Sequence, residues 1–590
     1  MRWRARVAPL VVAAVLGVAA CDGGSSQTPR PEAGSVVDRG RHADRNDVDA
    51  PERHGPVEIE GAREGGTVHV RDQFLLRTSA DPTEAYVRDS ISLLSGLVVR
   101  SLTQYAYDER TGDAVLVPDL ATDLGTPNDD YTEWAFTLRD GVRYENGAAV
   151  TVEDIGFAID RSFDRATFPG GASYSTRYFL NGDTYEGPYS DARRDSCDCY
   201  EIVGDTITIK MARPFPDMPY WGAFPAMSAI PKGEADPETY RRHPLATGPY
   251  KFATYTPGRA LTLVRNEEWD PSTDPARTQY PDRYDFRSQV PRREVHRVIL
   301  SDTGQGRTTM TREDVPASAY RRFKAMAPER LVLGGSSCTH YVAPDYRVVT
   351  DIDVRRAIAY AYPYEAVNLA AGYVEGVTAI PADNLMPPGV PGRREYDPEP
   401  DLGDFSTDTA EAKRLLRGSG NLGYEVRFLW RVDDDLSTKV KEATVKSLTE
   451  AGFEVTPVPT TEAEYIDARD DVTSDINLRV GGWCSDWSSG ASWLPPLLGT
   501  RNLEQEGFGP NTAAFSEEDV DDRISRILRL PLGEQAAAWN DLDRYVSETY
   551  FPMVTTLYTG VSQAHGSRIG GHFADGVYGQ PTWKNIHVTR

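Results

Sequence analysis

Residues 424–487 read YEVRFLWRVDDDLSTKVKEATVKSLTEAGFEVTPVPTTEAEYIDARDDVTSDINLRVGGWCSDW and decide the fold class. Their periodicity predicts alternating elements: strand 424–430, a helix from a cap at Asp435, strand 453–455, helix 463–469 and strand 476–480. A β-α-β-α-β run implies a parallel sheet wrapped by helices. Ligands of open parallel sheets bind at the carboxyl ends of the strands, so the segment GGWCSDW (481–487) lies where a ligand is expected.

Asp486 stands between Trp483 and Trp487 in this segment. An acid packed among indoles is costly to ionise unless a cation meets it. The cation is either part of a ligand or a local arginine such as Arg479, and the residues alone do not separate these two interpretations. For Trp483 we favour packing in the core.

The rest of the body predicts a mixed α+β first half and further helices in the second. The expected strands are 67–70, 134–138, 142–144, 206–210 and two strands in 247–270 around the turn 256–258. The expected helices are 93–98, one that starts at a capping box of Thr151 and Asp154, 354–362 and 410–416.

The N-terminus has the pattern of a secreted lipoprotein. Arginines 2, 4 and 6 precede an apolar run at 7–18, which is too short to span a bilayer of about 30 Å and suits a signal peptide. The run ends in Ala19-Ala20-Cys21, which resembles a bacterial lipobox, so residues 1–21 are expected to be a signal peptide and Cys21 the lipid attachment site. Plain secretion is the alternative. Residues 22–65 are rich in Pro, Gly and charge, and predict a disordered tether.

Composition excludes several classes of function. The 590 residues are 39% hydrophobic and carry a formal net charge of −25, which speaks against nucleic acid as a partner. The chain lacks G-x-x-x-x-G-K-[ST], G-x-S-x-G and H-E-x-x-H motifs, and its G-x-G-x-x-G match at 418–423 follows a helix, the reverse of a dinucleotide site. We therefore expect no catalytic residues, no metal and no cofactor.

Four cysteines besides Cys21 lie in an expected oxidising compartment: Cys197, Cys199, Cys338 and Cys484. An even number there suggests disulfides. The C-x-C spacing of Cys197 and Cys199 looks too tight for an easy bridge, and the set has poor spacing for zinc. The redox state of Cys197 and Cys199 stays open.

Several segments occur in an order that resembles a known family. They are LVPDLA (116–121), the strand-turn-helix segment 131–157, GPY (248–250) with RN (265–266), VRRAI (354–358) and AKRLL (412–416). Together they resemble family 5 of the extracytoplasmic solute-binding proteins of ABC importers, which bind dipeptides, oligopeptides or nickel. Residues 301–315 depart from the family pattern.

The resemblance implies a two-lobed periplasmic-binding-protein fold of type II, similar to cluster C, with a hinge and an extra subdomain. Its expected divisions are lobe I at 66–300 with a subdomain inserted at about 84–195, an α/β lobe II at 301–540, and a return to lobe I at 541–590.

The resemblance also implies site residues. GGWCSDW is similar to the G-W-C-x-D-[YW] segment of oligopeptide-binding proteins, whose aspartate meets the α-ammonium of the peptide and whose cysteine pairs with one in a C-T-x-Y segment. Carried over, this makes Asp486 the ammonium ligand and pairs Cys338 with Cys484. The other expected ligand-binding residues are Ser485, Trp487, Arg469 and Arg479, although Arg479 is one residue off the family register.

The implied function is a lipid-anchored, monomeric component of an ABC importer on the outer face of the cytoplasmic membrane. It would bind a peptide in the cleft between the lobes and deliver it to a permease. The alternatives are the same fold binding a nickel chelate or an oligosaccharide, a receptor that signals without transport, and a cell-surface hydrolase.

Overall fold

The computed structural model describes residues 55, 57–76, 79–107, 114–190, 196–399, 405–503 and 511–590. The expected signal peptide, Cys21 and most of the expected tether lie outside the described residues. Residues 57–65 contact the body, since the backbone N–H of Ile59 donates to the Tyr280 hydroxyl and Glu64 pairs with Arg265.

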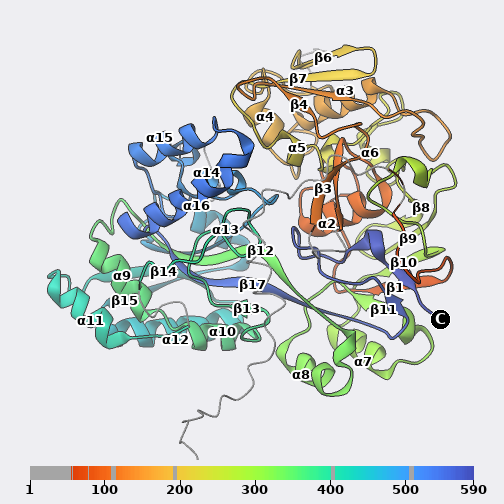
Figure 1. Cartoon of the computed structure of the whole chain (residues 1–590). Coiled ribbons are helices and arrows are strands. Elements are labelled where there is room, and N and C mark those ends of the chain that lie inside the picture. The colour runs from red at the N-terminus through yellow and green to blue at the C-terminus, as the bar shows by residue number, and fades with distance from the viewer. Residues whose placement is uncertain are drawn as a thin grey trace, which may run out of the picture.

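Two lobes share one large sheet (Figure 1). Its strand order is β16-β12-β17-β11-β1-β10-β9-β8, with β13 paired to β17. The strands are β1 (Thr67–Arg71), β8 (Tyr250–Thr256), β9 (Ala260–Arg265), β10 (Arg283–Arg287), β11 (Thr309–Thr311), β12 (Leu331–Pro344), β13 (Ala379–Ile380), β16 (Leu478–Cys484) and β17 (Val554–His565).

The long strands β12 and β17 run from one lobe into the other (Figure 1). Residues 331–335 of β12 pair with 560–564 of β17, and residues 339–342 pair with 554–558, with register shifts between the two stretches. A break in the ladder of this kind bends a sheet. We refer to the elements before β12, together with the C-terminal residues after β17, as lobe I, and to the elements between β12 and β17 as lobe II.

Lobe I carries a second, smaller sheet with the order β4-β5-β7-β6, at the top of Figure 1. Its core holds Trp134, Phe136 and Ile209, against which helix α3 packs. The remaining lobe I elements are β2 (Thr103–Tyr107), β3 (Ala114–Pro118), β4 (Thr126–Pro127), β5 (Glu133–Thr137), β6 (Tyr200–Val203), β7 (Thr206–Lys210), β18 (Ile569–Gly570) and β19 (His587–Val588), with helices α2 (Arg88–Leu93), α3 (Val152–Ser162), α4 (Tyr174–Tyr178), α5 (Met218–Trp221), α6 (Pro237–Tyr240), α7 (Arg292–Ser301) and α8 (Ala317–Met326).

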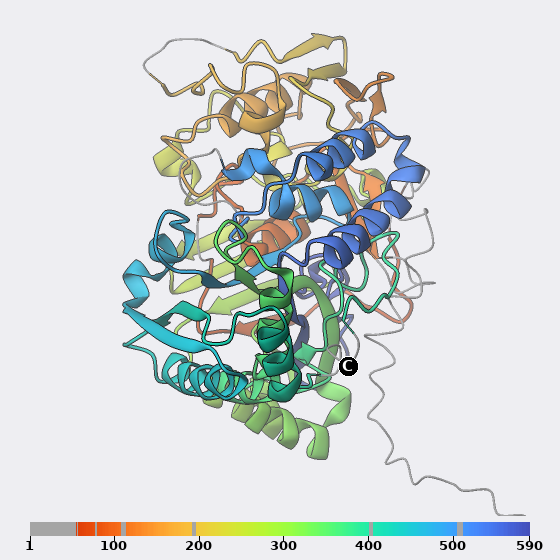
Figure 2. The same cartoon turned by 90° about the vertical axis from the view of Figure 1, so that its left-hand side faces the viewer.

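Lobe II has two helical layers, each with its own core. Figure 2 shows the C-terminal helices of lobe II in blue, between the small sheet of lobe I and the lower helices of lobe II. The elements are α9 (Ile352–Ala361), α10 (Tyr364–Ala371), α11 (Thr409–Gly418), β14 (Glu425–Arg431), α12 (Asp435–Ala451), β15 (Glu454–Thr460), α13 (Glu462–Asp470), α14 (Leu494–Leu498), α15 (Glu518–Ile527) and α16 (Leu532–Thr549).

One pairing expected from the β-α-β-α-β run is wrong. Strands β14 and β15 are parallel neighbours, but β16 pairs antiparallel with β12 in the large sheet. Asn477, just before β16, still links the two sheets, because its side chain accepts from the Arg427 backbone N–H and donates to the Glu425 carbonyl. The segment after β16 therefore starts from the edge strand of the large sheet that the two lobes share.

Most local expectations hold, with three exceptions, one of which is the cap of α12: Asp435 is the first residue of the helix, and the carboxylate of Asp434 accepts the Leu436 N–H as the N-cap. Thr151 and Asp154 form the expected capping box of α3, but residues 142–144 form only one isolated bridge, between Arg143 and Ala149. Cys197 and Cys199 form a disulfide despite their close spacing. Asp198 between them has φ 55°, which turns the chain back and leaves the two Cα atoms 5.1 Å apart.

None of the helices in the described ranges is long and apolar enough to cross a membrane. The predicted domain limits, 66–300, 301–540 and 541–590, stay predictions.

Candidate ligand-binding site

The site begins where β16 ends. Cys484, the last residue of β16, lies directly opposite Cys338 of β12, and the two form a disulfide with their Cα atoms 4.0 Å apart. This is the pairing that the resemblance implied. The cross-link holds the start of the segment 485–489 against one of the two strands that connect the lobes.

Asp486 reaches across to lobe I. Its Oδ2 atom accepts hydrogen bonds from the hydroxyls of Tyr86, at 2.8 Å, and Tyr174. Neither tyrosine was predicted as a site residue. Burial raises the pKa of both hydroxyls well above the usual value, so they stay protonated donors.

The charge of Asp486 is only partly compensated. Burial raises the pKa of its carboxyl, while the two tyrosine donors and the charges of Arg88 and Arg177 oppose that rise. Among the described residues, nothing donates a hydrogen bond to Oδ1. Arg479, the local partner considered from sequence, pairs with a different acid. One carboxylate oxygen is therefore anchored and the other is free to accept from a ligand.

Trp487 is inserted into an aromatic cluster of lobe I. Its side chain is 1% exposed, and its ring centroid lies 4.6 Å from Tyr174, 5.9 Å from Phe224 and 6.2 Å from Phe215. The indole Nε1–H donates to Asp217 at 2.5 Å. Trp487 thus joins the lobes and does not line an open pocket. Trp483 packs against the lobe II core, as expected.

Asp217 is a second buried acid at this contact. Its carboxylate accepts from Trp487 Nε1 and, at 3.2 Å, from Ser489 Oγ. Burial raises the pKa of Asp217 to about 6, although the hydrogen bonds from these two donors lower it. The segment 485–489 therefore contacts lobe I through two carboxyl groups. Its own Asp486 accepts from lobe I tyrosines, and Asp217 of lobe I accepts from Trp487 and Ser489.

Ser485 and Arg88 complete the contact. Ser485 is 1% exposed, and no described residue bonds its hydroxyl. Its carbonyl accepts from Arg88 at 3.5 Å, and Arg88 also donates to the Tyr578 carbonyl at 3.3 Å. Arg88, like the tyrosines, was not predicted.

The two other expected arginines lie elsewhere. Arg479 is 1% exposed and pairs with Asp345 at 2.9 Å, so its guanidinium has a structural partner and we leave it out of the site. Arg469, on α13, pairs with the neighbouring Asp470 at 2.6 Å and keeps a quarter of its side chain exposed. Neither contacts Asp486.

A cavity of about 490 Å³ opens between the lobes next to Arg88. Lobe I lines it with residues near Phe74, Arg88 and Arg312, and lobe II with residues near Tyr373. Its lining also includes Gly560 of β17, beside the bend in the connecting strands. Small-molecule sites commonly have volumes of roughly 300–1,000 Å³ and lie between domains. No cluster of metal-binding side chains occurs in the described part of the chain.

The comparisons with known proteins agree with this architecture. The family model for bacterial extracellular solute-binding proteins, family 5 (middle), matches residues 115–505. The chain belongs to this family. Family 5 consists of binding proteins, so the chain is a solute-binding protein and not an enzyme.

Curated relatives of this family 5 protein are named for peptide ligands. It is 22% identical over 428 residues to the periplasmic oligopeptide-binding protein OppA of Salmonella typhimurium (strain LT2), with 68% of this chain and 72% of OppA covered. It is 24% identical over 432 residues to the glutathione-binding protein GsiB of Salmonella paratyphi A, with 68% and 73% covered.

Solved structures show the same two-lobed fold. Clavulanic acid biosynthesis oligopeptide binding protein 2 matches with a TM-score of 0.81 and 24% identity, covering 92% of this chain and 99% of its own. The periplasmic binding protein DppA from Helicobacter pylori, in complex with the peptide STSA, matches with a TM-score of 0.66 and 18% identity, covering 90% and 99%. At these identities the likeness establishes the fold alone.

Proposed function

We propose that this family 5 protein binds oligopeptides or dipeptides between its lobes and delivers them to an ABC permease. The observation that carries the proposal is the position of Asp486, a half-buried carboxylate at the contact between the lobes, one oxygen of which accepts no hydrogen bond from a described residue. The α-ammonium of a peptide supplies the cation and the hydrogen-bond donors that this oxygen lacks. The peptide ligands named for OppA and DppA support this reading.

Binding would stabilise the closed arrangement of the lobes. A peptide held at Asp486 that extends into the cavity beside Arg88 touches both lobes, so it shifts the population toward closure. The bend in β12 and β17 is the element that such a motion would use. The closed form would then dock on the permease.

The predicted N-terminus places this event at the membrane. Cys21 is proposed to carry the lipid that keeps the protein, as a monomer, on the outer face of the cytoplasmic membrane. Of the predicted tether 22–65, residues 57–65 contact the body, so the proposed tether is the part before them. A lipidated cysteine with two or more acyl chains holds far better than one chain.

The test is peptide binding by an Asp486→Asn variant. Asparagine keeps the size of the side chain and an acceptor for Tyr86 and Tyr174, and loses the charge. A charged hydrogen bond contributes roughly 1.5–3 kcal/mol, so we expect the Kd for a free-amino tetrapeptide to rise roughly 10–150-fold by calorimetry. Asp522→Asn, on the exposed surface of α15, is the matched control.

Unchanged affinity in Asp486→Asn would show that the ammonium is held elsewhere. If no peptide binds the wild type, native mass spectrometry of protein purified from its own host identifies the solute that does. A nickel chelate or an oligosaccharide found in this way would replace the peptide proposal.

A further inference from the structure

The cavity between the lobes contains a second carboxylate, which the contact at Asp486 does not use. Asp314 lines this cavity of about 490 Å³ from lobe I, and the residue is exposed. It lies in the segment 301–315, which departs from the family pattern. The family resemblance therefore assigns Asp314 no role, and its function has to be inferred from its surroundings.

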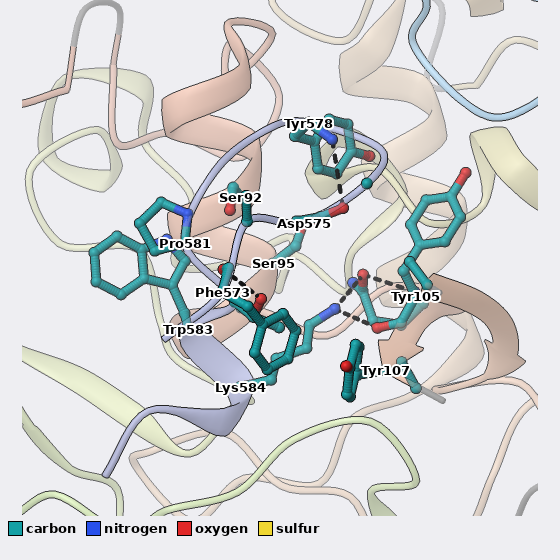
Figure 3. Close-up of a pocket in the computed structure, with 17 residues that line it drawn as sticks. Ser92, Ser95, Tyr105, Tyr107, Phe573, Asp575, Tyr578, Pro581, Trp583 and Lys584 are labelled. Carbon is teal, nitrogen blue, oxygen red and sulfur yellow. Dashed lines mark hydrogen bonds between the residues drawn. The ribbon is translucent and has the colours of Figure 1, made fainter. Parts of the chain in front are cut away.

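A smaller pocket lies inside lobe I, between strand β2 and the loop 573–584 (Figure 3). Its free volume is about 30 Å³, and one water needs roughly 10–15 Å³. Lys584 in this pocket donates to the Gln104 side-chain oxygen at 2.9 Å and to the Tyr105 carbonyl, with Asp575 as an acidic neighbour. Its charged groups thus have partners, and the interlobe cavity, not this pocket, has room for a peptide side chain.

Asp314 follows strand β11 and is fixed against β17. Its Oδ1 atom accepts the backbone N–H of Ser562 at 2.9 Å. The N–H of the next residue, Val315, donates to the Ser562 carbonyl at 2.6 Å. None of the described residues donates a hydrogen bond to Oδ2. One oxygen is therefore anchored to a strand that connects the lobes, and a group held in place in this way loses little freedom when a guest binds.

The neighbouring charges form pairs that leave Asp314 out. Arg292 pairs with Glu313 at 2.9 Å, and Arg312 pairs with Asp72 at 2.7 Å. Asp314 forms no ion pair with any residue in the described ranges. Desolvation by the protein around the cavity raises the pKa of its carboxyl, while the charges of Arg292 and Glu313 act on it in opposite directions. A cation in the cavity would compensate this acid.

The remaining charges of the lining are Arg88 and Asp89. Arg88 donates to the Ser485 carbonyl at 3.5 Å, and Asp89 lies 3.9 Å from Arg312. Neither is among the charges that shift the pKa of Asp314. Asp314 is thus a separate negative position within the cavity.

Aromatic rings lie close to this carboxylate on both sides of the cavity. Tyr373 lines it from lobe II, and the charge of Asp314 adds to burial in raising the pKa of its hydroxyl. Phe74 lines it from lobe I, is 48% exposed, and has its backbone N–H 3.3 Å from the carboxylate of Glu313. Aromatic faces attract ammonium and guanidinium groups, and apolar rings cover the stem of a long basic side chain.

We propose that Asp314 binds the charged end of a lysine or arginine side chain and makes the protein selective for basic peptides. The carboxylate supplies the counter-charge, and the rings of Phe74 and Tyr373 cover the stem. The inference rests on the proposed function, in which a peptide held at Asp486 extends past Arg88 into the cavity. A side chain between Asp314 of lobe I and Tyr373 of lobe II also adds to the stability of the closed arrangement.

The test is calorimetry with tetrapeptides in which arginine, or its neutral isostere citrulline, stands at each position in turn. We expect the wild type to prefer arginine roughly tenfold or more at one position, because citrulline cannot form the ion pair. Lysine and its side-chain acetylated form give the same comparison for an ammonium group.

The variant Asp314→Asn keeps an acceptor for the Ser562 N–H and loses the charge. It should abolish the preference by weakening the basic peptides alone. Asp522→Asn, on the exposed surface of α15, should keep the preference. If Asp314→Asn does not fold, Asp314→Ser, with a smaller side chain and an acceptor, takes its place.

Acetylation of the peptide amino terminus separates the two acids. It should weaken binding by the same factor in the wild type and in Asp314→Asn, because Asp486 is intact in both. If Asp314→Asn removes the effect of acetylation, Asp314 holds the amino terminus itself, and the proposal is overturned.

The proposal is also overturned if the wild type binds peptides but prefers neither basic residue over its neutral isostere at any position. A preference that persists in a folded Asp314 variant overturns it as well. In both cases the proposed function stands. If the wild type binds no peptide of the series, the proposed function fails and this inference fails with it.

Discussion

Replacement of Trp487 by phenylalanine should weaken ligand binding without unfolding the protein. The substitution keeps an aromatic ring in the cluster with Tyr174 and removes the indole N–H that donates to Asp217 at 2.5 Å. Ser489, at 3.2 Å, then remains as the donor to the buried Asp217 carboxylate. A hydrogen bond to a charged group contributes roughly 1.5–3 kcal/mol.

This energy belongs to the closed arrangement, because Trp487 follows a lobe II strand and Asp217 lies in lobe I. If opening breaks the bond, the variant loses closed-state population, and the apparent Kd rises by up to roughly 10–150-fold, less when the free wild type is already mostly closed. Calorimetry with one peptide measures the change. Where the free wild type is substantially closed, small-angle scattering of the free protein should report a larger radius of gyration for the variant.

The matched control is Trp430→Phe, on β14 of lobe II, whose ring faces Lys441. It should bind peptide as the wild type does. The reasoning is refuted if neither readout changes, that is, if Trp487→Phe binds within twofold of the wild type and also has the same radius of gyration. That result would mean that the segment 485–489 moves together with lobe I.

Three further predictions concern stability. Replacing Cys338 and Cys484 by serine should lower the free energy of unfolding by about 4–5 kcal/mol on the chain-entropy model, since the bond closes a loop of 146 residues; denaturant titration measures this, and an unchanged midpoint would contradict it. Arg479→Met should lower the free energy of unfolding by roughly 1.5–3 kcal/mol, because buried Asp345 loses one charged hydrogen bond and keeps Arg347 as its partner, with peptide affinity unaffected in the folded fraction; a selective loss of affinity would return Arg479 to the site. The folded pKa of Asp217, about 6, lies above its ordinary 3.8, so its carboxyl binds a proton more readily when folded, and stability should fall as pH rises from about 4 to 6. In thermal unfolding, Asp217→Asn should reduce the dependence of stability on pH between about pH 4 and 6. A pH dependence identical to that of the wild type would show that Asp217 is not the titrating group.

The fold was predictable where the pattern is local and periodic. The helices and strands of 424–484 follow from hydrophobic spacing, and the structure confirms them apart from the cap of α12, which is Asp434 and not Asp435. The pairing of β16 was not predictable in this way, because strand order depends on contacts with β12, far away in sequence. The Cys197–Cys199 bridge was missed because the left-handed turn at Asp198 leaves no clear mark in the residues.

In the candidate site, too, the local features were predictable and the long-range contacts were not. Asp486 was proposed from a short motif, whereas its partners Tyr86 and Tyr174 lie 400 and 312 residues away and carry no local signal. Asp217 is likewise 270 residues from Trp487. The ion pair of Arg479 with Asp345 was not predictable for a related reason, since a motif one residue out of register does not reveal that the side chain turns toward Asp345.

The central claim is that the free oxygen of Asp486 receives the amino terminus of a peptide. Calorimetry of one peptide in free-amino and N-acetylated forms, against wild type and Asp486→Asn, tests it most directly. We expect acetylation to weaken binding roughly 10–150-fold in the wild type and to have little further effect in the variant, because both changes remove the same contact. Equal affinity of the wild type for the two forms would contradict the claim.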